Sequence, residues 1–143
     1  MGKRRDGRLA AVQFLFANDV QQIATDPPSR AAFWSIHQAK GVARDFAEAL
    51  IDGVIEHRTE IDEIIGRQLE NFRFERLAVV DRNVLRLAGF ELLYSPDLPT
   101  PIIMNEAIEV AKILGGTESG SFVNGVLDRM AKTLRPSAST PAP

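Results

Sequence analysis

Residues 77–116 carry the clearest structural pattern in the chain: LAVVDRNVLRLAGFELLYSPDLPTPIIMNEAIEVAKILGG. In the first half of this stretch, apolar residues recur every three or four positions, which is the spacing of one buried helix face. The segment SPDLPTP then ends the helix, because proline removes a backbone donor and restricts the residue before it. Thr100 and Pro101 suit the N-cap and first position of a second helix, and Gly115 and Gly116 suit its end. The stretch therefore predicts two helices joined by a short connection.

The same helical spacing continues on the N-terminal side. A first helix is expected to end at the segment TDPPS, and further helices are expected over residues 29–37 and 42–57. Thr59 is expected to cap the helix that follows. The buried face expected for the first helix consists of Leu9, Val12, Phe16, Val20 and Ile23.

The C-terminal side predicts one more helix, opened by Ser119 or Ser121. The apolar residues spaced for its buried face are Val123, Val126, Leu127, Met130 and Leu134. Nowhere does the chain alternate apolar and polar residues for long enough to form a half-buried strand. The sequence therefore predicts an all-α protein.

Length and composition fit one helical domain over residues 1–135. The chain has 143 residues, of which 45% are hydrophobic and 25% are charged, as in an ordinary globular protein with a real core. Residues 136–143, PSASTPAP, have nothing to bury, so we expect a disordered tail. No apolar run is long enough to cross a membrane and no signal peptide is recognisable, so we expect a cytoplasmic protein.

Catalytic and metal-binding chemistry finds no support in the residues. The chain has no cysteine, which excludes disulfides, thiolate catalysis and cysteine zinc sites, and His37 and His57 have no ligand spacing around them. Glu106 and Glu109 share a helix, but Glu109 with Lys112 is the spacing of an ordinary surface pair. Neither a nucleophile elbow nor a phosphate-binding glycine loop occurs. We therefore expect no enzymatic activity, no cofactor and no metal.

Charge is concentrated at the N-terminus. Residues 1–8 contain Lys3, Arg4, Arg5 and Arg8 against one acid, so they carry about +3 while the whole chain carries −2. Cations at the start of a helix oppose its dipole, whereas a bound polyanion would be held by both the side chains and the dipole. This cluster suggests nucleic-acid binding; the alternative is a terminus that only aids solubility.

Four segments together resemble the NusB family of transcription antitermination proteins. They are RxxAVQxLFxxD at 8–19, NFxxERLxxVDRNVLRLAGFELL at 71–93, PTPIIMNEAIEVAKILGG at 99–116 and FVNGVLDRM at 122–130. The resemblance implies two three-helix bundles with a short additional helix, and no enzymatic activity. It also implies that ribosomal protein NusE is a partner, and that the pair binds the single-stranded boxA element of nascent transcripts. Other Nus factors and RNA polymerase complete the implied antitermination complex, notably in ribosomal RNA operons.

The resemblance also implies roles for individual residues. The implied RNA contacts are Lys3, Arg4, Arg5, Arg8, Phe16, Arg86 and Phe122. The implied contacts with the protein partner are Asp81, Arg82 and Glu118. Phe16 stands where the family often has tyrosine, and Asp6 interrupts the basic run, which suggests weaker RNA binding.

Simpler interpretations exist for two of these groups. Phe122 either packs in the core or forms a stacking platform near the N-terminal basic surface. Asp81, Arg82 and Arg86 fit a solvated helix face on which the arginines pair with Asp81.

Two other functions remain open from the sequence. Ribosomal RNA cytosine methyltransferases carry a NusB-like RNA-binding domain, but this chain has neither a cysteine nucleophile nor room for a cofactor-binding sheet. A helical scaffold that binds only protein, including a homodimer of the free chain, is the other alternative. Salt-dependent retention of RNA separates such a scaffold from an RNA-binding protein.

Overall fold

The computed structural model describes residues 2–37, 39–70 and 73–136. These residues form the helices α1 (Lys3–Gln21), α2 (Pro27–Ile36), α3 (Gly41–Glu56), α4 (Arg58–Arg67), α5 (Val79–Tyr94), α6 (Thr100–Gly115) and α7 (Thr117–Leu134). A short 3-10 turn, η1 (Phe74–Arg76), precedes α5. Within the described ranges no β-strand occurs, and the all-α prediction is confirmed.

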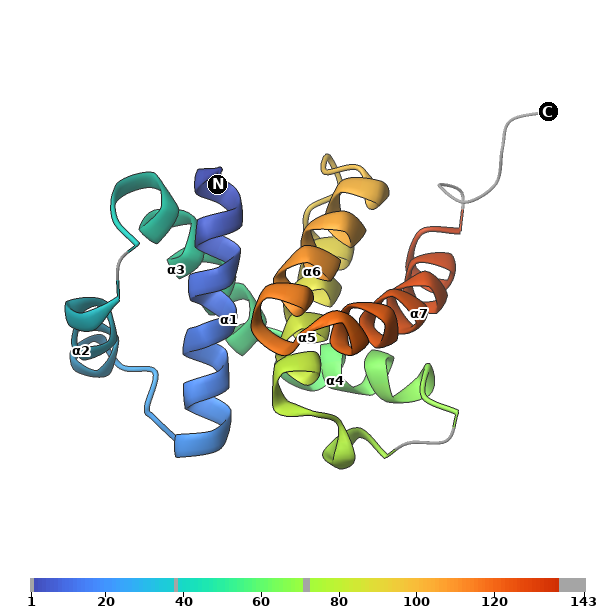
Figure 1. Cartoon of the computed structure of the whole chain (residues 1–143), viewed down its shortest axis with the longest axis horizontal. Helices are drawn as coiled ribbons and strands as arrows, with labels where there is room; N and C mark the ends of the chain where they lie inside the picture. The colour runs from blue at the N-terminus through green and yellow to red at the C-terminus, as the bar shows by residue number, and fades with distance from the viewer. Residues whose placement is uncertain (1, 38, 71–72, 137–143) are drawn as a thin grey trace.

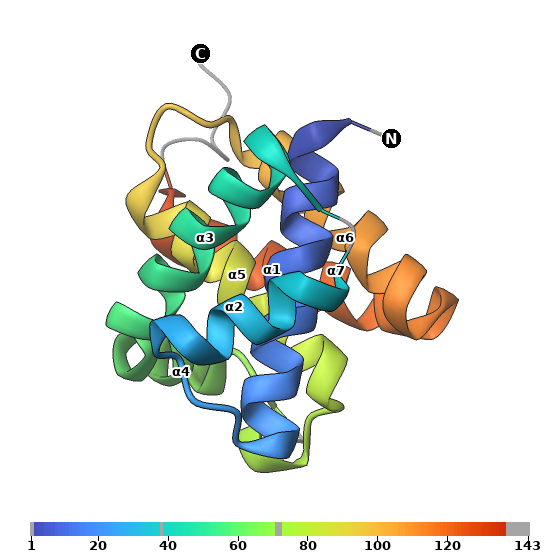
Figure 2. The ribbon, with the colours of Figure 1, turned by 90° about the vertical axis from the view of Figure 1, so that its left-hand side faces the viewer.

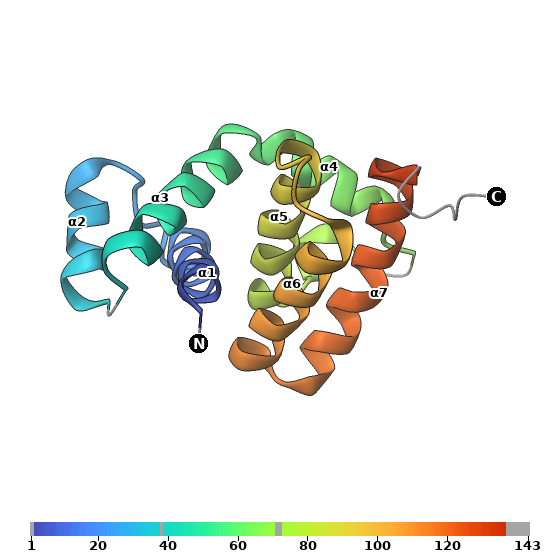
Figure 3. The same cartoon turned by 90° about the horizontal axis from the view of Figure 1, so that it is seen from above.

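The helices form two groups (Figure 3). One group contains α1, α2 and α3, and the other contains α5, α6 and α7, with the short helix α4 beside α5. Figure 2 shows α2 lying across α1 on the outer side of the molecule, where Phe33 packs edge-on against Phe14 at 5.2 Å between ring centroids. This arrangement matches the expected two three-helix bundles with one additional helix.

Helix α1 joins the two groups, because it packs against both α3 and α5 (Figure 1). Its approach to α3 is close at Gly7, where an added Cβ would lie 2.8 Å from the Ala43 carbonyl oxygen and 2.8 Å from the Phe46 ring. Ala10 and Ala11 are fully buried, and such small side chains let neighbouring helices come near. The close packing of α1 against α3 within the first group therefore depends on a small residue of α1.

The expected buried face of α1 is largely wrong. Val12 is buried, but Phe16 is 36% exposed, Val20 is 52% exposed and Ile23 lies beyond the end of the helix. The core takes the neighbouring face instead: Ala10, Ala11, Phe14 and Leu15. A helix packed on two sides buries a broad surface, so a single stripe of large residues does not identify it.

Helix boundaries differ from the expected ones at four places. Pro99, and not Thr100, is the N-cap of α6. The prolines of TDPPS open α2 instead of only ending α1, and Asp26 caps α2 by accepting a 2.9 Å hydrogen bond from the backbone N–H of Ser29. Thr59 is not a cap, because α4 follows α3 after His57 alone. Helix α7 begins at Thr117, before either predicted serine.

The break between α6 and α7 is a confirmed prediction. Gly116 has φ +89°, a left-handed conformation that favours glycine, and it lies between the two helices. The predicted face of α7 is also confirmed, since Val123, Val126, Leu127 and Met130 are fully buried. Helices α5, α6 and α7 thereby share one apolar core.

The tail predicted over 136–143 lies outside the described residues apart from Pro136. In the described part of the chain, no helix combines the length and apolar character that crossing a membrane requires.

Candidate RNA and protein interface

Arg8 is an interior residue. Its Nε and Nη2 atoms donate hydrogen bonds of 2.9 and 2.8 Å to the two carboxylate oxygens of Glu91 near the end of α5. Both side chains are 3% exposed. A buried bidentate pair of this kind holds the start of α1 against α5 and leaves Arg8 no surface for a phosphate.

Arg5 also binds a carboxylate of the second group. Its Nε and Nη2 atoms donate hydrogen bonds of 3.2 and 2.6 Å to Glu106 of α6. The hydrogen bond from Arg5 holds the pKa of Glu106 below its ordinary value, although burial acts in the opposite direction. Arg5 keeps a third of its side chain exposed, so it belongs to the surface while serving the fold.

Lys3 and Arg4 remain as exposed cations at the start of α1. Neither forms an ion pair with any of the described residues. The Arg4 guanidinium lies 5.7 Å from the centre of the Phe46 ring, which leaves its outward side open. These two residues are the N-terminal cations best placed to contact an anion.

The structure divides the N-terminal basic cluster in two. The sequence predicts that Lys3, Arg4, Arg5 and Arg8 form one phosphate-binding group that brings no benefit to the fold. That expectation is wrong for Arg8, because its charge is neutralised in the interior by Glu91. No local sequence signal reveals this pair, since its partners are 83 positions apart.

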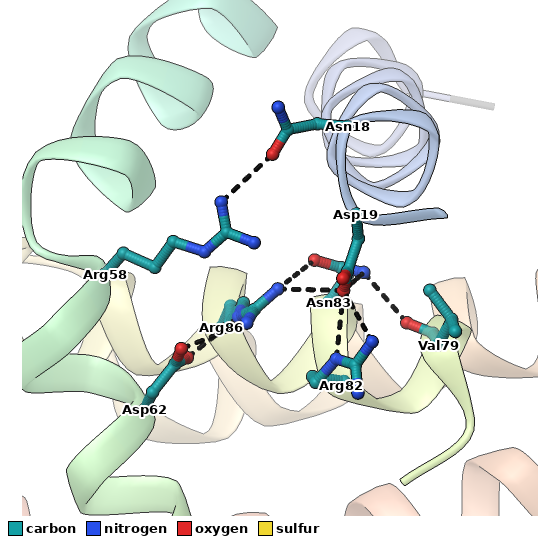
Figure 4. A network of polar contacts seen from close by, with 8 residues as sticks. All are labelled: Asn18, Asp19, Arg58, Asp62, Val79, Arg82, Asn83 and Arg86. Carbon is teal, nitrogen blue, oxygen red and sulfur yellow. Dashed lines mark hydrogen bonds and ion pairs between the residues drawn. The ribbon is translucent and has the colours of Figure 1, made fainter. Parts of the chain in front are cut away.

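Arg86 is the centre of a polar network between α1, α4 and α5 (Figure 4). It donates two hydrogen bonds to Asp62, of 2.8 and 3.0 Å, and one of 3.0 Å to Asp19. A further 3.0 Å bond reaches the side-chain oxygen of Asn83. With 4% of its surface exposed, Arg86 has all three guanidinium nitrogens engaged and is not free to bind RNA.

Arg82 contributes to the same network. It donates a 2.9 Å hydrogen bond to Asp19, the acid near the end of α1. Burial alone would raise the pKa of Asp19, but hydrogen bonds from Arg82 and Asn83, with the charges of Arg82 and Arg86, hold it below its ordinary value. The expected ion pairs of Arg82 and Arg86 with Asp81 are therefore wrong: both arginines bind Asp19, and Arg86 also binds Asp62.

Asp81 lies on another side of α5, beside a surface pocket of about 340 Å³. The pocket is also lined by Glu118, Ser119 and Phe122. Asp81 is 7% exposed, so the expectation of a solvated position is wrong, and its Oδ1 atom has no hydrogen-bond partner among the described residues. Glu118 is exposed, and Phe122 is partly buried against the core, as its packing interpretation expects, while a stacking role for its ring stays a prediction.

A buried carboxylate with one oxygen unsatisfied and no cation paired with it is electrostatically unfavourable. Burial raises the pKa of Asp81, and hydrogen bonding from Ser119 lowers it by a smaller amount. The lining residues include two acids, Asp81 and Glu118, against one cation, Arg76, together with an apolar wall, so the pocket is acidic overall. A cationic side chain from outside would relieve the cost, so the pocket suits a basic protein partner.

We expect Asp81→Asn to stabilise the unbound protein at neutral pH. The raised pKa means that the folded state binds the proton more tightly, so the contribution of Asp81 to stability falls as pH rises above about 3.8, its ordinary value. Removing the charge should raise the free energy of unfolding by on the order of 1 kcal/mol at pH 7. The reason is that burying an unsatisfied neutral group costs less than burying an unsatisfied charge. Urea unfolding at pH 7 and below pH 4 measures this, and an advantage of the variant that persists at acidic pH would contradict it.

The N-terminal cations lie at the start of α1, whereas Asp81 lies in the first turn of α5, which contacts the other end of α1. The start of α1 contacts the end of α5 through Arg8 and Glu91, whereas the end of α1 contacts the start of α5 through Asp19 and Arg82. The 19 residues of α1 span about 27 Å. Phe122 lines the Asp81 pocket, whose lining includes none of the N-terminal cations, so its expected place near the N-terminal basic surface stays a prediction.

Three comparisons with known proteins agree. The sequence profile of the NusB family matches residues 5–132. Transcription antitermination protein NusB of Sorangium cellulosum (strain So ce56) is 45% identical over 134 residues, which cover 94% of this chain and 95% of that protein. The protein of the same name from Bacillus subtilis (strain 168) is 41% identical over 135 residues, which cover 94% of this chain and 99% of that protein.

Solved structures share the fold. T. maritima NusB has a TM-score of 0.78 at 41% identity and covers 90% of both chains. A structure of antitermination factors NusB and NusE in complex with dsRNA has a TM-score of 0.80 at 27% identity, covering 92% of this chain and 97% of that one. NusB proteins are non-enzymatic transcription factors, which confirms the prediction that this protein is not an enzyme. The chain belongs to the NusB family of transcription antitermination proteins.

Proposed function

We propose that this protein binds ribosomal protein NusE and, with it, boxA-like single-stranded RNA of nascent transcripts. In this role it helps RNA polymerase, with other Nus factors, to pass terminators in the cytoplasm, notably in ribosomal RNA operons. The observation that carries the proposal is the match of nearly the whole chain to the NusB family, a relative of which is found with NusE and RNA. That related complex holds dsRNA, so the preference for a single strand is part of the proposal.

The surface charges support an RNA-binding role for the start of α1. Lys3 and Arg4 are exposed and unpaired among the described residues, and they lie at the positive end of the helix dipole. Arg5 adds a partly exposed charge. Phe16, at 36% exposure, lies farther along α1 and offers an aromatic ring to a base. Arg8 and Arg86 are buried in ion pairs, so they support the fold and are not among the proposed RNA contacts.

The Asp81 pocket supports a role in binding NusE. A ribosomal protein is expected to be basic, and the pocket presents Asp81 and Glu118 beside the ring of Phe122. Arg82 lies on the same helix and is tied to Asp19. In this assignment Asp81 and Glu118 receive basic side chains of NusE, while Arg82 orients the end of α1.

RNA binding measured with and without NusE tests the proposal. Fluorescence anisotropy should show tighter binding of a labelled boxA-like strand in the presence of NusE than in its absence, and weaker binding of a scrambled strand. A duplex of the same sequence serves as the competitor that separates single-strand from double-strand recognition. Asp81→Asn should weaken NusE binding about tenfold, because it removes the charge that a basic side chain would meet.

The matched control is Asp128→Asn on α7, an acid of similar charge paired with Lys132 at 3.1 Å and remote from Asp81 in the chain. It should leave NusE binding unchanged. Equal affinity for boxA-like and scrambled strands, with or without NusE, would contradict the proposed specificity. Stronger binding of the duplex would contradict single-strand recognition.

A further inference from the structure

A second pocket, larger than the one beside Asp81, lies next to the start of α1. Its volume is about 560 Å³, within the range of about 300–1,000 Å³ that small-molecule sites occupy. It is lined by side chains of α1, of the connection from α2 to α3, and of the end of α6. Neither the buried Arg8–Glu91 pair, nor the network around Arg86, nor the Asp81 pocket uses these residues.

The apolar part of this pocket is poorly covered. Val42 at the start of α3 is 59% exposed and Ile113 near the end of α6 is 49% exposed. Leu9 and Leu114 are partly buried between them. Exposed branched side chains that line one pocket indicate a surface that another molecule covers.

The rim of the pocket is cationic. It includes Lys3, the first residue of α1, and Lys40, which caps α3. Both side chains are exposed and have no ion pair within the described ranges. The two helix starts add partial positive charge on the same side, and Asp6 is the one acid among the lining residues.

The polar wall of the pocket offers a hydrogen-bond donor. The backbone N–H of Ala39 donates to Nδ1 of His37 at 3.1 Å, so in the neutral ring the proton is on Nε2. Nε2 then donates to the side-chain oxygen of Gln13 at 2.7 Å. The hydrogen bond from His37 orients the side-chain amide of Gln13 and uses its oxygen. The NH₂ group of the same amide has no acceptor in the described part of the chain.

From this combination we infer that the pocket receives a nucleobase of a single RNA strand, while Lys3 and Lys40 contact the phosphates on either side of it. The apolar wall of Leu9, Val42 and Ile113 covers the faces of the base, and the Gln13 amide donates to an acceptor on its edge. The inference rests on the proposed RNA-binding function and adds a base-binding subsite to it.

Charge and position favour RNA over a protein segment. An acidic peptide would match the lysines, but Lys3 of the pocket is followed in the chain by Arg4 and Arg5, two further cations at the surface of the start of α1. Leu9, Gln13, Phe16 and Val20 follow one another on a single face of α1, at spacings of four, three and four residues. A strand held in the pocket can therefore continue along α1 toward the exposed ring of Phe16.

The test compares two RNA probes, a labelled oligouridine and a strand of equal length without bases. Binding is measured by anisotropy over a salt series, with the full chain alone and with NusE. Ile113→Ser should weaken oligouridine binding about fivefold and leave the abasic strand unaffected, since it removes apolar contact with a base. Lys40→Ala should flatten the salt dependence of both probes by about 0.7, the value for one phosphate contact of a single strand.

Matched controls come from the same helices or the same residue types. Ile102→Ser alters an isoleucine of α6 with 46% exposure outside the pocket. Lys132→Ala removes an exposed lysine of α7. Neither control should change the binding of either probe.

Two results would overturn the inference. One is an equal loss for both probes in Ile113→Ser, which would show that the pocket does not sense a base. The other is a shift of Ile113→Ser in sedimentation from dimer to monomer with unchanged RNA binding, which would assign the surface to a second copy of the chain. Failure of the parent protein to bind either probe, alone or with NusE, would instead reject the proposed RNA-binding function.

Discussion

Arg8→Ala is expected to lower the free energy of unfolding by about 3–5 kcal/mol. The substitution leaves the Glu91 carboxylate buried at 3% exposure without the guanidinium that binds both of its oxygens. It also removes a contact with the Phe46 ring, whose centre lies 5.1 Å from the guanidinium carbon. Urea unfolding monitored by circular dichroism measures the loss.

A double variant separates the two causes of that loss. Arg8→Met with Glu91→Leu removes both charges and keeps most of the apolar volume, so it should recover much of the stability lost in Arg8→Ala. A loss below about 1 kcal/mol in Arg8→Ala would show that the pair is hydrated and that Arg8 remains available to an anion.

Arg86→Ala is expected to destabilise the protein by about 3 kcal/mol. It removes three hydrogen bonds that join α1 and α4 to α5 and one to Asn83 within α5, and it leaves Asp62 and part of Asp19 without their cation. The loss should be smaller than for Arg8, because the Asp62 side chain is 24% exposed and water can replace the lost donor. Unfolding in urea again supplies the measurement.

Arg67→Ala is the control for Arg86→Ala. Arg67 pairs with Glu63 at 3.9 Å on the surface, where both side chains are mostly exposed. Surface pairs contribute about 0–1 kcal/mol, so this variant should unfold almost as the parent does. Similar losses in the two variants would mean that the network around Arg86 is not structurally important.

Local patterns predict much of this fold because the features that determine a helix lie within a few residues of it. Pro101 in the first turn of α6, Gly116 at the break before α7 and the apolar face of α7 are all visible in the sequence and present in the structure. The buried face of α1 cannot be read from the sequence in this way. Two neighbouring helices bury the broad surface around Ala10 and Ala11 and leave Phe16 at the surface.

The candidate site is less predictable from the sequence. Contacts between residues that are far apart in the chain decide which of its charged side chains are neutralised in ion pairs and which remain exposed. Nothing in the local sequence separates Arg5 and Arg8 from Lys3 and Arg4, since all four are basic residues of one cluster. The partners of Arg5 and Arg8, which are Glu106 and Glu91, lie 101 and 83 positions away. The same holds for Arg86, which reaches Asp19 across 67 positions. A cluster of like charges therefore predicts a binding surface, while the fold decides which members remain free to bind.

The salt dependence of RNA binding by the double variant Lys3→Ala with Arg4→Ala tests this division of the basic cluster most directly. Each phosphate contact with a single strand contributes about 0.7 to the slope of log affinity against log salt. The variant should flatten the slope by about 1.4, weaken binding to every strand, and unfold at the same urea concentration as the parent. Arg67→Ala with Lys132→Ala, a matched loss of two exposed cations elsewhere, should leave the slope unchanged. A parent-like slope in Lys3→Ala with Arg4→Ala would contradict the account, and the start of α1 would then serve the fold alone.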